Sequence, residues 1–355
     1  LVYVYDAMNR LKHECVKGAP SWPYVSPWVP LCTPVEESRR LGDSSSTWNI
    51  RIQIMVRGNT LTESPRTKVT FTIVTAVFVL LLWIGFATDL FLHKASTESI
   101  VNSDKIPDIL LGLFRLGAAY LAFHAIVFWM VISPRPGIMY SINYHTGNVD
   151  QHEVKGLERL VTFSSWQLIL CGIFFFLAGV VSWLTFFEME IPSFLNRLIP
   201  LLYFMALSAS SLTAIVVRYV IIPADFKSRN PLGHLFLKHE QVMHNWTLIL
   251  LSVELVLGSI EVLPEGVILG GFLGGIYFYF AFVWARFFGQ YFVYDFIDPR
   301  PKSAPYAIVG LVLAFGVFFM TMYALYLVLE WNQWVGIPLV ALFVQRSVLF
   351  NPPTN

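Results

Sequence analysis

Seven long apolar runs, separated by short polar connections, constrain this chain more than any other feature of its sequence. A bilayer core about 30 Å thick is crossed by roughly 20 apolar residues in helical form, and each run has about that length. Backbone polar groups cannot remain unpaired in lipid, so each run is expected to form a helix. We therefore predict an all-α polytopic membrane bundle of about seven transmembrane helices, antiparallel between neighbours. The runs cover residues 69–93, 108–132, 163–187, 197–222, 245–263, 266–288 and 304–330.

The composition excludes most classes of soluble protein. Apolar residues make up 56% of the 355 residues and charged residues 13%, which lies outside the usual range of soluble domains. The formal net charge is +1 and the Lys and Arg residues are scattered, so we expect no nucleic acid partner. Three cysteines, Cys15, Cys32 and Cys171, fit neither a disulfide framework nor a four-ligand zinc site.

The first 68 residues differ from the rest of the chain. The segment PSWPYVSPWVPLCTP is rich in Pro and aromatic residues, and no helical or strand period persists around it. Trp22, Trp28 and Trp48 give this extension apolar surface that a freely solvated linker does not need. We expect residues 1–68 to be a non-membrane extension that packs against other membrane-protein subunits. The chain begins with Leu rather than Met, which is compatible with loss of a targeting peptide.

The C-terminal tail, residues 331–355, follows the transmembrane domain of residues 69–330. Its stretch Val335–Phe350 is interrupted by Pro338 and is too short for an ordinary crossing. We expect this stretch to lie at the membrane interface or against a neighbour.

Basic residues gather in one of the two sets of loops that the seven crossings create. Such residues concentrate on the cytoplasmic, matrix or stromal side of a membrane, so the N-terminus is predicted on that side and the C-terminal tail on the other. Endoplasmic reticulum, mitochondrial inner membrane and thylakoid are all compatible with this pattern. The opposite loops carry only Lys94, Lys105 and Arg197 before the tail. The basic loops carry Arg51, Arg57, Arg66, Lys68, Arg135, Lys155, Arg159, Lys227, Arg229, Lys238, Arg286, Arg300 and Lys302.

Two polar residues open crossings on the predicted inner side. Thr162 precedes the third run and His244 precedes the fifth, so the topology places them at similar depth in one leaflet. A threonine hydroxyl becomes nucleophilic when a nearby base removes its proton, and imidazole is the usual base near neutral pH. The pair is therefore a candidate for ester hydrolysis at the lipid interface. Thr162 is also suited to cap the third helix, and His244 to lie at headgroup level.

Glu254 lies ten residues beyond His244, which on a regular helix is about 15 Å deeper. It is expected either to line the floor of a substrate pocket or to pair with Arg115 or Arg218, which lie within the second and fourth runs. Intramembrane charges generally find partners, which favours the ion pair. His124 in the second run is expected to form a hydrogen bond between helices rather than to bind haem.

A group of histidines near the fifth run does not predict a metal site. His234, His239 and His244 follow one another at spacings of five, and each step turns a regular helix by about 140°, so the three do not share one face. His239-Glu240 lies one residue too far from His244 for the HExxH zinc motif. A di-iron centre needs more imidazoles than this chain supplies. We therefore expect no metal and no organic cofactor.

Two glycine pairs in the sixth run, Gly270-Gly271 and Gly274-Gly275, indicate close helix packing. Small residues let helix backbones approach one another within a bilayer. We expect the sixth helix to contact its neighbours through these pairs.

Three motifs together resemble one superfamily of membrane proteins. They are LVTF at 160–163, MHN at 243–245 followed by Glu254 and Leu255, and GQYFVYDF at 289–296. In order and in position relative to the helices, they are similar to the superfamily of multi-pass membrane proteins that includes androgen-induced protein and rolling stone. The resemblance covers residues 157–331.

Members of the androgen-induced branch are intramembrane threonine hydrolases that cleave fatty acid esters of hydroxy fatty acids. The resemblance implies that Thr162 matches the nucleophile and His244 the catalytic histidine. It also implies that Glu254 and Tyr294 belong to the substrate pocket. Rolling stone relatives are not established as hydrolases, so membership alone does not imply activity.

The sequence therefore supports two functions of different classes. The first is a lipid ester hydrolase that uses Thr162 and His244, needs no cofactor and has membrane lipids as partners. The second is a non-catalytic subunit or assembly factor of a larger membrane complex, such as a mitochondrial respiratory or thylakoid complex. In that case the N-terminal extension and the C-terminal stretch are the docking surfaces.

Overall fold

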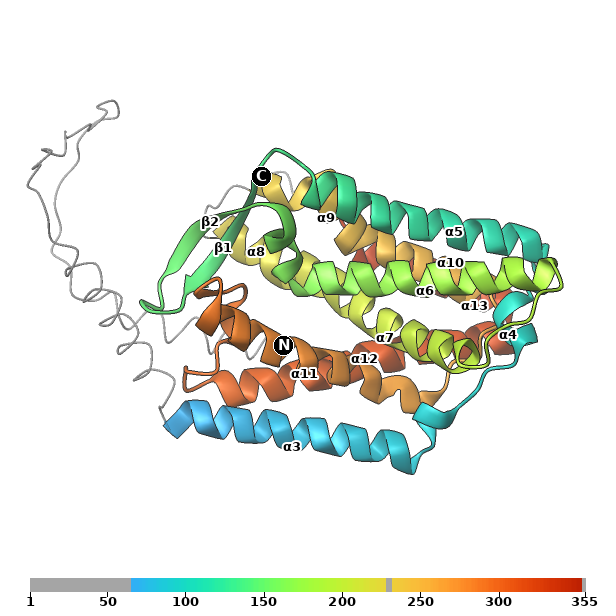
Figure 1. Ribbon diagram of the computed structural model, residues 1–355, viewed down its shortest axis with the longest axis horizontal. Coiled ribbons are helices and arrows are strands. Elements are labelled where there is room, and N and C mark those ends of the chain that lie inside the picture. The colour runs from blue at the N-terminus through green and yellow to red at the C-terminus, as the bar shows by residue number, and fades with distance from the viewer. Residues whose placement is uncertain (1–64, 228–231, 353–355) are drawn as a thin grey trace, which may run out of the picture. The chain divides into compact units, whose positions relative to one another are not determined.

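The computed structural model describes residues 65–227 and 232–352, and these form a helical bundle with a small sheet at one end (Figure 1). The predicted all-α polytopic bundle is confirmed. The N-terminal extension predicted over residues 1–68 lies outside the described residues, apart from its last four. Within the described part, six helices are long and apolar enough to cross a membrane: Arg66–Ala87, Asp108–Val131, Phe163–Phe186, Leu195–Lys227, Pro264–Phe287 and Ala304–Trp331.

The helical elements follow the predicted runs in order. The α-helices are α3 (Pro65–Ala87), α4 (Thr97–Val101), α5 (Asp108–His124), α6 (Phe163–Phe186), α7 (Leu195–Val216), α8 (Ile222–Lys227), α9 (Lys238–Gln241), α10 (Thr247–Leu257), α11 (Val267–Phe287), α12 (Ala304–Trp331) and α13 (Gln333–Ser347). The π-helical segments are η3 (Ala125–Val131), η5 (Val217–Ile221) and η7 (Val242–Trp246). Short 3-10 turns are η2 (Leu90–Leu92), η4 (Gly156–Val161), η6 (Leu232–Phe236), η8 (Pro264–Gly266) and η9 (Asp295–Ile297).

The fifth predicted crossing, residues 245–263, is displaced and more polar than expected. α9, η7 and α10 form one uninterrupted helix from Lys238 to Leu257, which we call the fifth helix. It is not among the six apolar spans, because polar side chains occupy much of its first half. The helix ends before Gly258, where the backbone is extended and a Cβ would lie 2.5 Å from Glu254 Oε1.

The C-terminal stretch forms a helix that returns along the bundle. α13 begins one residue after α12 and packs against α12, α10 and α7. Its end reaches the fifth helix, where Asn245 Nδ2 donates to Leu349 O (2.7 Å) and Leu349 N donates to Asn245 Oδ1 (3.1 Å). The described chain thus runs along the bundle eight times, in the six apolar spans, the fifth helix and α13. The end of α13 lies at the same end of the bundle as the start of α3, whereas the tail was predicted at the opposite end.

Three short antiparallel strands lie beyond one end of the bundle, which we call the sheet end. Their order is β2-β1-β3, with β1 at Gly137–Asn143, β2 at Val149–Val154 and β3 at Tyr291–Phe292. β1 and β2 lie between α5 and α6, and β3 follows α11, so these loops meet at the same end. Thr70 Oγ1 at the start of α3 donates to Pro299 O (3.0 Å), just beyond η9, which places the start of α3 at the sheet end too. The sheet was not predicted from the sequence.

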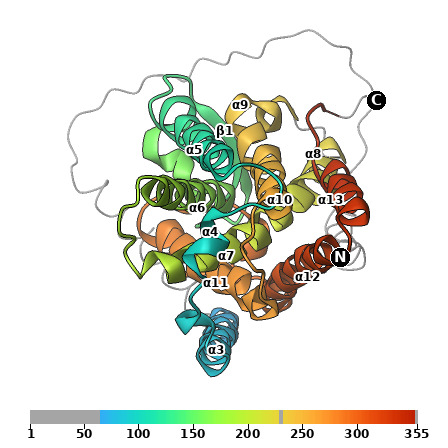
Figure 2. The same cartoon turned by 90° about the vertical axis from the view of Figure 1, so that its right-hand side faces the viewer.

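α7 occupies the middle of the bundle (Figure 2) and is the most buried of the six apolar spans. Small residues on α7 allow α11 and α12 to approach. Ser208 Oγ donates to Phe315 O (3.0 Å). A Cβ at Gly270 would collide with the Ser208 side chain, and one at Gly274 would lie 2.7 Å from Phe315. The close packing predicted for the glycine pairs is therefore confirmed.

Candidate active site

Thr162 lies at the start of α6, where η4 leads the chain from the sheet into the bundle. Its backbone is extended and its Oγ1 accepts a hydrogen bond from Ser165 N (3.2 Å). The same oxygen lies 2.6 Å from Ser165 Oγ and accepts from Ser164 Oγ (3.3 Å). Side-chain oxygens at this position satisfy the unpaired N–H groups of the first helical turn. Thr162 therefore caps α6, and its hydroxyl belongs to a cluster with those of Ser164 and Ser165, which we call the hydroxyl cluster.

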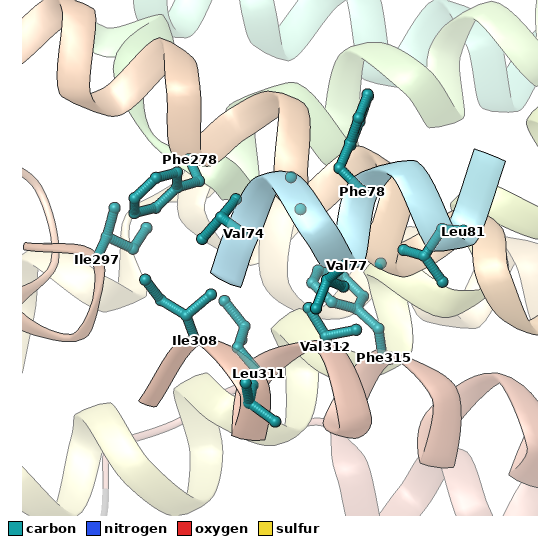
Figure 3. Close-up of a pocket in the computed structure, with 14 residues that line it drawn as sticks. Val74, Val77, Phe78, Leu81, Phe278, Ile297, Ile308, Leu311, Val312 and Phe315 are labelled. Carbon is teal, nitrogen blue, oxygen red and sulfur yellow. The ribbon is translucent and has the colours of Figure 1, made fainter. Parts of the chain in front are cut away.

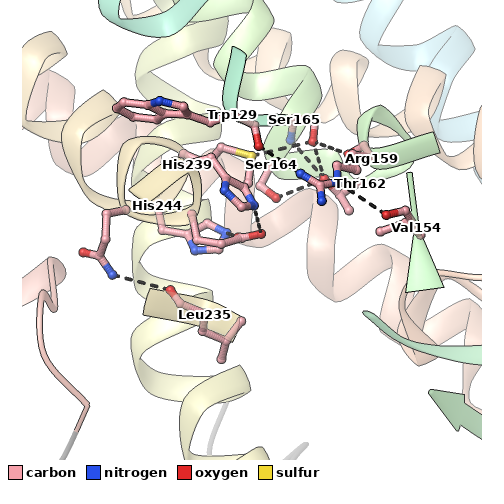
Figure 4. Close-up of polar contacts among 12 residues, drawn as sticks. Trp129, Val154, Arg159, Thr162, Ser164, Ser165, Leu235, His239 and His244 are labelled. Carbon is pink, nitrogen blue, oxygen red and sulfur yellow. Dashed lines mark hydrogen bonds and ion pairs between the residues drawn. The ribbon is translucent and has the colours of Figure 1, made fainter. Parts of the chain in front are cut away.

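Arg159 anchors the turn that carries Thr162. The side chain is largely buried, and its guanidinium donates to the carbonyl oxygens of Trp129 (2.9 Å) and Val154 (3.4 Å) (Figure 4). It also donates to the carbonyl oxygen of Arg135. The backbone carbonyl of Arg159 in turn accepts from Ser165 Oγ (2.9 Å). These bonds attach the start of α6 to the connection that follows α5, so the hydroxyl cluster is held by contacts on both sides.

Glu240 lies between two imidazoles at the start of the fifth helix. Its Oε1 is 3.4 Å from His239 Nε2 and its Oε2 is 3.4 Å from His244 Nε2. Both histidines are buried, whereas the Glu240 side chain keeps 22% of its surface exposed. The carboxylate therefore contacts two imidazole rings at once.

Three π-helical segments lie near the sheet end, one in each of three helices. η3 extends α5, η5 extends α7, and η7 contains His244. In η7 the Thr247 N–H donates to Val242 O, five residues earlier. The regular-helix geometry that separated His239 from His244 on different faces does not apply across such a turn. π-helical turns occur frequently at functional sites, so this end of the bundle is a candidate functional site.

The start of α6 and the start of the fifth helix pack against each other. Ser165 Oγ lies 3.6 Å from Met243 Sδ, so the two helix starts lie at the same depth, as the topology predicts. Among the described residues, no hydrogen bond joins Thr162 to His244, because each side chain bonds within its own group. In the view of Figure 4, Ser164 lies between Thr162 and the two histidines.

Tyr294, the tyrosine predicted to belong to the site, reaches the hydroxyl cluster from the segment after α11. Burial raises the pKa of Tyr294 to about 12, and a hydrogen bond with Ser164 partly offsets that effect. For Glu240, burial alone would raise the pKa of the carboxyl. The hydrogen bond with His239 and the charges of His244 and His239 outweigh burial and hold that pKa below its usual value. Glu240 is therefore ionised at neutral pH.

Glu254 forms a buried ion pair with Arg115 of α5. Arg115 Nη2 lies 2.5 Å from Glu254 Oε1, and Arg115 Nε donates to Oε2 (3.0 Å). The third guanidinium nitrogen, Nη1, donates to Ile100 O (2.6 Å) and Ser182 Oγ (3.1 Å). The predicted ion pair is confirmed, with Arg115 as the partner. Since Arg115 occupies both carboxylate oxygens, Glu254 holds the bundle together rather than lining a pocket with His244.

Arg218, the other predicted partner of Glu254, binds the end of the chain instead. Its Nη1 donates to the carbonyl oxygens of Gln345 (2.9 Å) and Val348. The neighbouring Tyr219 hydroxyl donates to Arg346 O (2.6 Å). These three bonds attach the last turn of α13 to the end of α7.

An apolar cavity lies between α3, α11 and α12 (Figure 3). It has about 510 Å³ of space, part of it open to the outside of the bundle, and its lining includes Val74, Phe78, Ile308 and Phe315. None of the described lining residues is titratable, so this part of the chain offers the cavity apolar contacts and no group for acid–base chemistry.

The described histidines, cysteines and carboxylates include no group of three or more that could hold a metal ion. Sequence reasoning missed two members of the candidate site. Glu240 was considered only as part of a zinc motif, although its spacing of four from His244 was a usable signal. Arg159 was noted only as a basic loop residue, and no local pattern marks its three backbone acceptors.

No protein-family model, curated protein or solved structure matches this chain. The resemblance to the androgen-induced and rolling stone superfamily therefore remains a prediction from the three motifs.

Proposed function

We propose that this chain is a membrane-embedded hydrolase of long-chain acyl esters, with Thr162 as nucleophile and His244 as base. The observation that supports the proposal is the Glu240 carboxylate, which lies 3.4 Å from a ring nitrogen of each of His239 and His244. These residues pack beside the hydroxyl cluster at the start of α6. A hydroxyl, an imidazole and a carboxylate that orients the imidazole are the parts required for nucleophilic acyl transfer.

In the proposed reaction, Thr162 Oγ1 attacks the ester carbonyl carbon while His244 takes the hydroxyl proton. The bond to the alcohol then breaks, and the alcohol leaves with the proton from His244. Water, deprotonated by the same imidazole, attacks the acyl-threonine and releases the fatty acid and the free hydroxyl. Ionised Glu240 stabilises the imidazolium in each half-reaction. Because Thr162 Oγ1 is engaged by Ser164 and Ser165, attack requires its rotation out of the cap.

Substitutions at Thr162 separate its capping role from a catalytic role. Asn, Ser and Thr all cap helices, whereas Ala does not and costs about 1 kcal/mol. Thr162→Asn therefore keeps the cap and removes the hydroxyl, and we expect it to melt like the wild type but to lose hydrolysis of a long-chain acyl ester. Thr162→Ser should retain both properties. The measurement is turnover of a fluorogenic long-chain ester by the purified chain in detergent, paired with a melting curve.

Thr247→Val is the matched control, because Thr247 is a threonine in the same region whose hydroxyl, among the described residues, bonds only to Met243 O (2.9 Å). We expect this variant to retain turnover. Full activity of Thr162→Asn would remove Thr162 as nucleophile and leave it as a cap. Glu240→Gln, which removes the charge beside both imidazoles, should lower kcat without abolishing expression.

We further propose that the sheet end faces the cytoplasm, matrix or stroma. Basic residues concentrate at this end, which is the usual bias of loops retained on that side. The return of α13 adds Arg346 to the same end. The other contributors among the described residues include Arg66, Lys68, Arg135, Lys155, Arg159, Lys227, Lys238, Arg286, Arg300 and Lys302.

The alternative proposal is a non-catalytic subunit of a larger membrane assembly. It is favoured by two tryptophans at the turn between α12 and α13, Trp331 at 77% exposure and Trp334 at 90%. Such side chains suit either the interfacial belt of a membrane or contact with a partner. Purification in mild detergent distinguishes the two functions, because a subunit is expected to travel with fixed partners whereas a hydrolase runs alone or as a small oligomer.

A further inference from the structure

One edge of the sheet has no strand beside it among the described residues. β2 lies at this edge and pairs there with β1 alone. Asn143 N donates to Asn148 O (2.9 Å), which fixes the direction of the backbone groups in this antiparallel ladder. Because these groups alternate between the two sides of a strand, those of Val149, Gln151 and Glu153 point away from β1. We call this row of backbone groups the β2 edge.

The β2 edge is suited to accept a further strand. Unpaired N–H and C=O groups at the edge of a sheet are a template for another extended segment. The side chains along the edge are exposed, and Val149 is 63% exposed, so the edge offers apolar surface as well as hydrogen bonds. An added strand uses both, because its main chain pairs with the edge and its side chains contact those of the neighbouring strand.

A segment with the pattern of a strand precedes α3 in the sequence. Residues 50–57 read IRIQIMVR and contain no Pro. Their even positions are all apolar and β-branched: Ile50, Ile52, Ile54 and Val56. Such alternation predicts a β-strand, and the following Gly58-Asn59 is typical of a turn. The pattern makes residues 50–57, which lie outside the described residues, a candidate to pair with the β2 edge.

The start of α3 lies within reach of the β2 edge. Thr70 Oγ1, near the start of α3, donates to Pro299 O (3.0 Å). The next residue, Arg300, donates through its guanidinium to Tyr144 O in the turn between β1 and β2. Figure 1 shows the two strands at the end of the bundle where α3 begins. The intervening residues 57–64 extend over as much as about 26 Å, so the segment can lie along β2.

Charge and polarity favour one register for this pairing. An antiparallel arrangement places three pairs of matching side chains directly opposite one another, one of opposite charge, one of two amides and one of two apolar groups. Cross-strand pairs of this kind stabilise a sheet. The β-branched row of the segment then falls on the other face of the sheet, beside the buried Val154. The three pairs are Arg51 with Glu153, Gln53 with Gln151 and Met55 with Val149.

We propose that residues 50–57 add a fourth strand to the sheet, antiparallel to β2 and with Gln53 opposite Gln151. In this direction the segment leaves the sheet beside the β1–β2 turn, which is the part of the hairpin that Arg300 binds. The added strand also holds β2, which leads through η4 to the turn that carries Thr162. The proposal does not depend on the hydrolase function, because it uses only the edge, the segment and the distance between them.

The test is disulfide formation in the full chain in its membrane, with Cys15 and Cys32 replaced by Ser. Gln53→Cys with Gln151→Cys puts thiols on opposite residues of a hydrogen-bonded pair, whose Cα atoms are about 5.5 Å apart, a separation that a disulfide spans. We expect mild oxidation to link them within one chain, as read by mass spectrometry of the joined peptides. Ile54→Cys with Gln151→Cys is the matched control. Successive side chains point to opposite faces of a strand, so this pair should be linked at least about 10-fold more slowly.

Hydrogen exchange of the β2 amides tests the backbone pairing without cysteines. In the proposed register the N–H of Gln53 points to β2 and that of Ile54 points away. Gln53→Pro removes a ladder hydrogen bond, and we expect the Gln151 amide to exchange about 10-fold faster or more. An edge strand tolerates Pro where its N–H faces away from the sheet, so Ile54→Pro should leave the exchange of β2 unchanged.

A charge exchange tests the register. In the Gln53→Cys, Gln151→Cys chain, Arg51→Glu should slow the linkage about 2- to 5-fold, and the addition of Glu153→Arg should restore it. Equal linkage of the two cysteine pairs, or an equal effect of the two prolines, would overturn the proposal. Disulfides that join two chains would also overturn it and would assign the β2 edge to a second copy of this chain.

Discussion

Replacement of Glu254 by Gln should destabilise the bundle strongly, because it leaves the Arg115 guanidinium charged and buried without its counter-ion. The two side chains are 0% and 1% exposed, and each oxygen of the carboxylate accepts from the guanidinium. Removal of one partner from such a pair costs about 3–5 kcal/mol, most of it the penalty of the uncompensated charge. The amide that replaces the carboxylate can still accept one hydrogen bond, so we expect a value near the lower limit.

The double variant Arg115→Met with Glu254→Gln should recover most of this loss. It removes the charge together with its counter-ion, and apolar replacements of buried ion pairs are often neutral or stabilising. Recovery should be incomplete, since Ile100 O and Ser182 Oγ lose the donor that lies 2.6 Å and 3.1 Å away. An unsatisfied buried acceptor costs about 1–3 kcal/mol. The penalty should come mainly from the Ile100 carbonyl, because the Ser182 hydroxyl keeps its hydrogen bond to Ala178 O (3.0 Å).

Thermal unfolding in detergent, followed by tryptophan fluorescence, measures these differences. At about 2–4 °C per kcal/mol for a chain of this order of size, Glu254→Gln should melt about 10 °C below the wild type and the double variant only a few degrees below it. A Glu254→Gln variant that melts with the wild type would refute the argument from the buried charge. Loss of ester hydrolysis in a stable double variant would instead return Glu254 to the substrate pocket.

Three further outcomes follow from individual contacts. Gln167 is fully buried with neither amide atom hydrogen-bonded in the described part of the chain, so Gln167→Met should raise stability by about 1–3 kcal/mol in the same melting assay. Gly270→Ala places a methyl group against Ser208 and should lower the free energy of unfolding by about 1–3 kcal/mol. The control Gly310→Ala meets nothing within 4 Å, so its stability should equal or exceed that of the wild type. Epitope tags on the two chain ends should be labelled from the same side of sealed vesicles if residues 1–64 add no crossing, and labelling from opposite sides would contradict the eight passes.

The long apolar helices could be predicted because a chain in lipid must pair its own backbone polar groups. A run of about 20 apolar residues that must pair its own backbone forms a helix, and six of the seven runs do so. The predicted end of the fifth run was wrong, because the helix ends before Gly258, next to Glu254. The return of α13 along the bundle was not predicted, because hydropathy does not register the contacts with α12, α10 and α7 that hold this short helix in place.

The candidate site was predictable in depth but not in detail. The order of the helices is enough to place Thr162 and His244 at one level, and the contact of Ser165 with Met243 bears out that level. The partners of each residue depend on features that leave no sequence signal. The π-helical turn of η7 changes which side chains share a face, and Arg218 meets backbone carbonyls 127 and 130 residues away.

The fifth helix explains why the chain turns back at its C-terminus. Several of its polar side chains have partners within the bundle, among them Asn245 with Leu349, Thr247 with Met243 O and Glu254 with Arg115. Such a helix is too polar to face lipid and must be enclosed by other helices. α13 packs along α10 (Figure 2) and covers part of that surface, and its end supplies the carbonyl that Asn245 needs. The last helix thus completes the enclosure of the helix that carries His244, which ties the end of the chain to the candidate site.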